Sequence, residues 1–137
     1  MSGNKNDAGK IKFTLIDIDS LSDLEGGMGE YTSIENAYFS LLLEKNSALA
    51  GNIFSLLHEE IYGTNEISLE TLKDLATLYT YGANMHHEQS WREVEVDRFI
   101  DALGRHLIEG NGIDSESKIP HLHHALWNAL TVYSLLG

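Results

Sequence analysis

Apolar side chains recur at every third or fourth position through most of this chain. That spacing places them on one face of an α-helix, whereas a strand would alternate at every second position. The only proline, Pro120, stands where a helix would begin. The spacing predicts an all-α fold, a compact bundle of four to five helices. The expected helices span residues 33–43, 48–61, 68–82, 92–109 and the segment from Pro120 onwards.

The first thirty residues do not share this pattern. Residues 1–10 are polar and predict a mobile arm, and residues 11–16 alternate apolar and polar, which favours a short strand or an extended arm. Residues 17–30 are rich in Asp, Ser and Gly and predict a loop. The length of 137 residues suits a single domain, 1–137, in which we expect residues 68–137 to carry the site.

Composition excludes several classes of function. The chain has no cysteine, which rules out disulfides and thiolate metal sites and fits a cytoplasmic protein. Its formal net charge of −12 would repel a nucleic-acid backbone, so we expect no binding to duplex DNA or RNA. No apolar run approaches the roughly 20 residues of a membrane span, and the polar start does not resemble a signal peptide.

Two of the expected helices carry polar residues on a shared face. Asp97, Asp101 and Arg105 are spaced four apart, and His106 follows them. On the last helix, His121 and His124 are three apart, a spacing at which two imidazoles can face one metal ion or one phosphate. The alternatives are a solvated ion-pair face for the first set and exposed or core histidines for the second.

A polar turn, residues 114–117, lies between these two helices. The turn either caps the last helix, with Ser117 as the cap residue, or contributes Asp114 and Glu116 to the site. The short connection makes the two helices antiparallel neighbours, so their polar residues and the turn converge. Carboxylates suit Mg²⁺ or Mn²⁺, imidazoles transfer protons, and arginine binds phosphate. This combination favours hydrolysis of a phosphoanhydride with a divalent cation.

The order of these residues also resembles a known family. The shared residues are Asp7-Ala8-Gly9-Lys10 with Lys12-Phe13 and Leu15-Ile16, then Tyr81-Gly82-Ala83, Trp91, Phe99-Ile100-Asp101-Ala102-Leu103, Arg105-His106-Leu107, Asp114, Glu116-Ser117, Pro120-His121-Leu122, His124-Ala125 and Asn128-Ala129-Leu130. This pattern is similar to that of small, mostly phage-encoded proteins described as dATP/dGTP diphosphohydrolase N-terminal-domain proteins. The resemblance covers a little over half of the chain.

The resemblance implies hydrolysis of a purine deoxynucleoside triphosphate to the monophosphate and pyrophosphate with Mg²⁺ or Mn²⁺, in a phage or prophage setting. It assigns three groups of residues. The expected catalytic residues are His106, His121 and His124. The expected substrate contacts are Lys10, Lys12, Arg105, Asn128 and Trp91. The expected metal ligands are Asp101, Asp114 and Glu116.

Some segments depart from the family pattern. Met85-His86 replaces a Lys-Tyr pair, Ser90 replaces an Asn, and residues 17–67 resemble an insertion. Two alternatives therefore stand beside the enzyme: a protein that binds or sequesters nucleotides without turnover, and a structural or interaction module. By analogy with other acidic all-α nucleotide hydrolases, a homo-oligomer is also expected.

Overall fold

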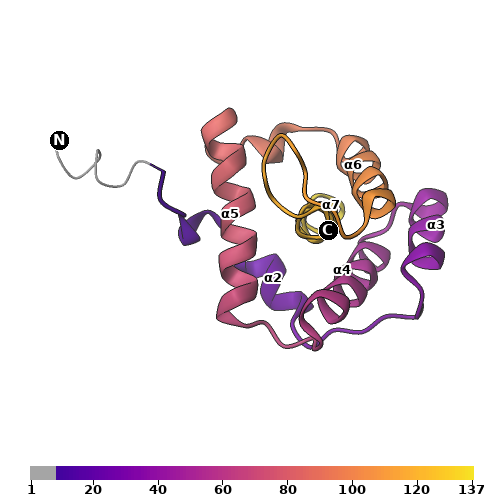
Figure 1. The fold of residues 1–137 in the computed structure, drawn as a ribbon. Helices are drawn as coiled ribbons and strands as arrows, with labels where there is room; N and C mark the ends of the chain where they lie inside the picture. The colour runs from indigo at the N-terminus through magenta and orange to yellow at the C-terminus, as the bar shows by residue number, and fades with distance from the viewer. Residues whose placement is uncertain (1–8) are drawn as a thin grey trace.

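The computed structural model describes residues 9–137, and α-helices dominate it (Figure 1). The six α-helices are α2 (Ile18–Leu24), α3 (Ile34–Glu44), α4 (Ser47–Tyr62), α5 (Leu69–Met85), α6 (Val96–Glu109) and α7 (His121–Leu136). Two short 3₁₀ turns accompany them, η1 (Phe13–Leu15) and η2 (Ser90–Glu93). The prediction of an all-α bundle is confirmed.

Side-chain caps fix where most helices begin. Ser33, Asn46 and Ser68 each accept a hydrogen bond from a backbone N–H in the first turn of α3, α4 and α5. These bonds satisfy N–H groups that have no partner within the helix. Ser68 forms a full capping box with Thr71, as its position before the apolar run predicted.

Helix α7 is the centre of the fold. It is seen nearly end-on in Figure 1, with α2, α4, α5 and α6 around it and α3 outside α4. Because neighbours cover several of its faces, five of its apolar residues are fully buried. These are Ala125, Leu126, Ala129, Leu130 and Val132. Burial of this kind supplies the main favourable term in folding.

The N-terminal third differs from the sequence predictions. The segment 17–30, expected to be a loop, contains α2, which Asp17 caps and which buries Leu21 and Leu24 against the core. The helix does carry Ile18, Leu21 and Leu24 at a spacing of three, but it spans only seven residues among Asp, Ser and Gly, and that composition favoured a loop. Residues 11–16 form no strand. Phe13–Leu15 make the 3₁₀ turn η1, and only the flanking Lys12 and Ile16 have extended backbone.

Two helix boundaries in the second half of the chain also differ from the predicted ones. The helix expected over 92–109 begins at Val96, because Ser90–Glu93 form the 3₁₀ turn η2. The helix expected to stop near Gly82 continues to Met85. Glycine weakens a helix by about 1 kcal/mol relative to alanine but does not end it.

A buried asparagine ties the loop before α3 to the core. The Asn52 side chain accepts a hydrogen bond from the Tyr31 N–H at 2.8 Å and donates one to the Tyr31 carbonyl at 3.1 Å. Gly29 lies so close to Asn52 that a Cβ at this glycine would fall 2.1 Å from the Asn52 side chain. The segment between α2 and α4 is thus packed onto the same core as the rest, although it was expected to be an insertion.

Residues 1–8, which contain most of the predicted mobile arm, lie outside the described residues. Within residues 9–137, no helix is long and apolar enough to cross a membrane.

The burial of α7 leads to a first prediction. Leu126 is fully buried, so Leu126→Ala should lower the free energy of unfolding by about 2–5 kcal/mol through lost contacts and a cavity. Leu69 on α5 is 75% exposed, and Leu69→Ala is the matched control, expected to change stability by less than about 1 kcal/mol. Urea unfolding followed by circular dichroism measures both. Equal losses in the two variants would contradict the central position of α7.

Candidate functional site

A cavity of about 340 Å³ opens between α5, η2, α6 and α7. This volume lies at the small end of the range for small-molecule sites. Helical spacing explains how each element contributes to it. Phe99, Ala102 and His106 lie on one face of α6, and Trp127 and Asn128 lie one turn after His124 on α7.

Aromatic rings form the walls of this cavity. The Tyr79 ring meets Trp91 edge-on with centroids 6.1 Å apart and Trp127 edge-on at 5.6 Å. Phe99 meets Trp127 in the same way at 5.5 Å. Edge-to-face contacts of this kind fix the rings against one another. The cavity therefore offers rigid π-surfaces to a flat ligand.

Four buried polar atoms of the lining residues have no hydrogen-bond partner among the described residues. They are the hydroxyl of Tyr79, the indole Nε1 atoms of Trp91 and Trp127, and the Oδ1 of Asn128. Asn128 is only 4% exposed. A buried polar atom without a partner costs about 1–3 kcal/mol, so such atoms are rare in folded proteins. Four such atoms on the residues that line one cavity make it the place where a ligand with polar edges would give them partners.

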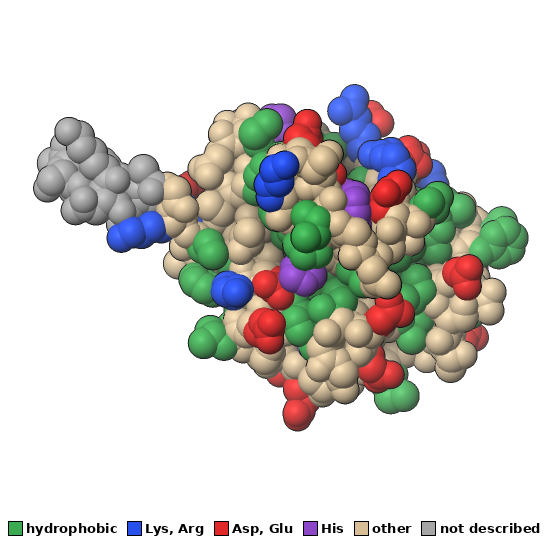
Figure 2. Space-filling view, viewed as in Figure 1, with side chains coloured by type: hydrophobic (Ala, Val, Ile, Leu, Met, Phe, Trp, Pro, Cys, Tyr) green, Lys and Arg blue, Asp and Glu red, His purple; other side chains and the backbone are tan. Residues whose placement is uncertain are grey.

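The charge of the lining contrasts with that of the chain. The chain carries 21 Asp and Glu residues and a net charge of −12, and acidic side chains are scattered over the face in Figure 2. None of the described residues that line the cavity is acidic, whereas five are basic or imidazole. These five are His86, His87, Arg98, His106 and His124. The lining thus suits a ligand that is aromatic and anionic.

The three predicted catalytic residues lie together. His106 and His124 line the cavity, and His121 contacts His106. The Nδ1 atoms of His106 and His121 lie 2.9 Å apart. The rings of His106 and His124 stack with centroids 4.5 Å apart and an angle of 8° between their planes. The sequence prediction that α6 and α7 bring these histidines together is confirmed as geometry.

This arrangement favours neutral imidazoles. Two Nδ1 atoms 2.9 Å apart can share one proton, as donor and acceptor, but cannot both carry one. Burial, together with the neighbouring His124 and His121, lowers the pKa of His106 to about 4. Burial also lowers the pKa of His124. An effective general base has a pKa near the working pH, so His106 is suited to neutral hydrogen bonding more than to proton abstraction.

Ser117, in the turn before α7, holds the imidazole of His124. Asp114 Oδ2 accepts hydrogen bonds from both the N–H and the hydroxyl of Ser117, each at 2.8 Å. These two bonds hold the pKa of Asp114 below its usual value. Because the Ser117 proton is directed at Asp114, the Nε2–H of His124 donates to Ser117 Oγ, at 2.7 Å. Ser117 therefore positions His124 and is not arranged as a nucleophile.

The three predicted metal ligands do not form one group. Asp101 lines a groove beside α3 with Tyr38 and Arg105, whereas Asp114 and Glu116 belong to the turn before α7. Across residues 9–137, no set of three or more His, Asp or Glu side chains is arranged to hold one metal ion. The donor set present therefore does not fit a preformed metal site.

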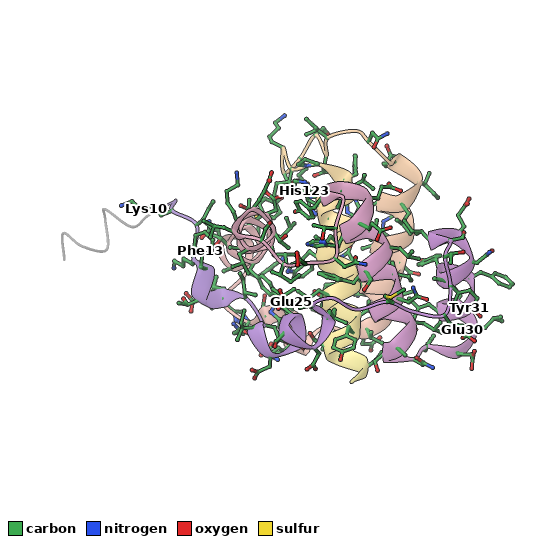
Figure 3. All side chains as sticks on the ribbon, turned by 90° about the horizontal axis from the view of Figure 1, so that it is seen from below. Lys10, Phe13, Glu25, Glu30, Tyr31 and His123 are labelled. Carbon is green, nitrogen blue, oxygen red and sulfur yellow. The ribbon has the colours of Figure 1, made fainter. Side chains whose placement is uncertain are left out.

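The predicted substrate contacts are divided between several places. Trp91 and Asn128 line the cavity. Lys10 lies where the described chain begins, with α5 between it and α7 (Figure 3). Lys12 packs on α5, where its N–H donates to Thr80 Oγ1 and its Nζ pairs with Glu88 at 3.3 Å. Arg105 lies in the grooves outside the cavity.

Sequence reasoning missed several lining residues. Trp127, Phe99, Arg98 and Tyr79 line the cavity, but the sequence did not single them out as site residues. The signal available was composition: the chain has only two tryptophans, and one of them directly precedes Asn128. Outside the cavity, His58 is a buried core histidine whose ring nitrogens contact the Thr64 carbonyl and Thr71 Oγ1.

The fold and the cavity together define an all-helical domain with an aromatic-lined cavity between α5, α6 and α7. The family model described as "dATP/dGTP diphosphohydrolase, N-terminal" matches residues 58–136, and the chain belongs to this family. The match covers every residue of the cavity lining except Leu15. Comparison with curated proteins and with solved structures found no match.

The low pKa of His106 gives a prediction for stability against pH. The unfolded chain binds a proton at His106 near pH 6.5, whereas the folded protein resists protonation until about pH 4. The contribution of His106 to the free energy of unfolding is therefore fully present above pH 6.5 and is lost as the pH falls toward 4.

The variant His106→Asn keeps a hydrogen-bonding group but cannot titrate. Urea unfolding at pH 7 and pH 4.5 should show a smaller loss of stability for this variant than for the wild type. Carboxylates titrate in the same range in both proteins, so the difference between the two isolates the histidine. Identical losses would show that His106 is not held neutral.

Proposed function

We propose that this protein binds a purine deoxynucleoside triphosphate, with the base in the aromatic cavity, and hydrolyses it to the monophosphate and pyrophosphate. The observation that carries the proposal is the lining itself: aromatic walls, partnerless polar atoms and no carboxylate, in a strongly acidic chain. The family description supplies the reaction and the choice of purines.

The aromatic walls support the base. Stacking of a nucleobase on an aromatic side chain contributes about 1–3 kcal/mol. Trp91 is 7% exposed and Tyr79 is 4% exposed, so both rings are held in place before a ligand arrives. A preformed site of this kind loses little entropy on binding.

The basic groups of the lining support the phosphates. Arg98 lines the cavity from the first turn of α6, and the exposed His86 and His87 line it from the end of α5. Arginine forms charge-assisted hydrogen bonds to phosphate oxygens that are roughly twice as strong as neutral ones. A volume of about 340 Å³ suits a base with its sugar, which leaves the phosphates toward solvent and these groups.

In this proposal the divalent cation is bound mainly by the phosphates of the substrate. Mg²⁺ is commonly bound through substrate phosphates with only one or two carboxylates. This agrees with the scattered positions of Asp101, Asp114 and Glu116. We propose Mg²⁺ or Mn²⁺ as the partner of the nucleotide, without a preformed protein site for it.

Binding without turnover is the second candidate. The low pKa of His106 disfavours it as a base, and the described residues gather no metal-binding group. The test offers each of the four deoxynucleoside triphosphates with Mg²⁺ or Mn²⁺, measuring binding by calorimetry and products by ion-exchange chromatography. Release of monophosphate and pyrophosphate from dATP and dGTP supports the enzyme, and saturable binding without product supports the second candidate. No binding of any nucleotide would refute both.

A glycine in the lining gives a variant that blocks the cavity without unfolding the protein. Gly82 lines the cavity, and a Cβ added there meets nothing within 4 Å. Gly82→Leu should abolish nucleotide binding while stability stays equal or rises by up to about 1 kcal/mol, because glycine disfavours a helix. Asn84→Leu, at an exposed position two residues further along α5, is the matched control. Unchanged binding by Gly82→Leu would place the site elsewhere.

Two arginines on α6 test where the phosphates lie. Arg98 lines the cavity, whereas Arg105, predicted from the sequence as the phosphate contact, lines outer grooves. We expect Arg98→Gln to weaken triphosphate binding roughly three- to tenfold with less effect on the deoxynucleoside. Arg105→Gln should change neither. The reverse result would move the phosphates to the side of Asp114 and His121.

A further inference from the structure

The side chain of Asn128 is the most unusual polar group in the cavity. It comes from the central helix α7 and is 96% buried, since its exposure is 4%, and its Oδ1 has no hydrogen-bond partner among the described residues. The chain offers a contrast in Asn52, which is also buried but bonds Tyr31 through both ends of its amide. Asn128 therefore lacks the structural role that explains Asn52.

We propose that the amide of Asn128 reads position 6 of the purine base and accepts either an amino or an oxo group there by rotating about its own axis. This rests on the proposed function, because it assumes that the base occupies the cavity. Rotation by 180° about the terminal torsion exchanges the amide oxygen and nitrogen without moving any other atom. One residue could then serve both purines that the family description names.

The hydrogen-bond patterns of the two bases agree with this. Adenine presents an amino donor at position 6 and an acceptor at N1, which match amide oxygen and nitrogen respectively. Guanine presents an oxo acceptor at position 6 and a donor at N1, which match the rotated amide. In both cases the pairing is bidentate, and good bidentate pairs contribute about 1–3 kcal/mol of discrimination.

The two indoles supply what the amide cannot. An indole Nε1–H only donates, so Trp91 and Trp127 each need an acceptor from the ligand. Purines offer ring nitrogens N3 and N7 outside the edge that Asn128 would contact. Pyrimidines lack N7 and the second ring, so they leave more of the cavity unfilled. The sugar is attached at N9, opposite the edge at Asn128, and so points toward the mouth.

The ligand-side experiment needs no variant. Affinities of the wild-type chain with Mg²⁺ are measured by calorimetry for dATP, dGTP and the purine deoxynucleoside triphosphate that carries only hydrogen at position 6. We expect dATP and dGTP to bind with similar affinity and the unsubstituted analogue to bind about tenfold more weakly. An analogue that binds as tightly as dATP would overturn the inference.

The protein-side experiment uses Asn128→Leu, which keeps a similar volume and removes the hydrogen bonds. It should weaken dATP and dGTP roughly ten- to a hundredfold, and the unsubstituted analogue by a smaller factor, because that analogue loses only its N1 bond. Asn36→Leu is the matched control at an exposed position on α3, and it should change none of the affinities.

The outcomes separate this inference from the function it rests on. If the wild type binds no deoxynucleoside triphosphate, the proposed function and the role of Asn128 are both refuted. If it binds them and Asn128→Leu weakens all three ligands by the same factor, the nucleotide site stands and the reading of position 6 is overturned. If Asn128→Leu does not fold, the comparison of the three ligands on the wild type decides alone.

Discussion

Helix α7 has to satisfy two demands at once, and the rest of the structure follows from them. Its apolar residues, such as Leu126 and Leu130, require α2, α4, α5 and α6 as cover. The same helix also presents His124, Trp127 and Asn128 to the cavity. Because the core and the cavity share one helix, part of the lining is held by an element that is itself fixed in the core. A site on such an element is positioned more rigidly than one on loops.

The contact between His106 and His121 links this helix to α6. Two nitrogens 2.9 Å apart hold a single proton between them, so the pair stays bound only while at least one ring is neutral. Stacking of His106 on His124, and the bond from His124 to Ser117, extend this link to the turn at Asp114. These polar residues of α6, of α7 and of the turn between the two helices thus form one connected network. Its loss would loosen one wall of the cavity.

Much of the fold could be predicted from the sequence, and less of the site. Long helices such as α4 and α5 show several turns of apolar spacing, and caps such as Ser68 mark where they begin. Helix α2 has only seven residues, and its apolar spacing through Ile18, Leu21 and Leu24 lies within a segment whose Asp, Ser and Gly content indicates a loop. The convergence of His106, His121 and His124 followed from two antiparallel helices. The position of Asp101 did not, because the sequence fixes the face of a helix but not which neighbour covers that face.

The charge of the protein sets how such a cavity could hold a nucleotide. A net charge of −12 opposes the approach of a triphosphate, although at physiological salt this repulsion is screened beyond about 8 Å. Arg98 is the one permanent cation among the described lining residues, since burial keeps His106 and His124 neutral near pH 7. Phosphate attraction at this site is therefore modest. In the proposed complex, most of the affinity would come from stacking and from hydrogen bonds to the base, since the lining supplies buried aromatic rings and polar atoms without partners.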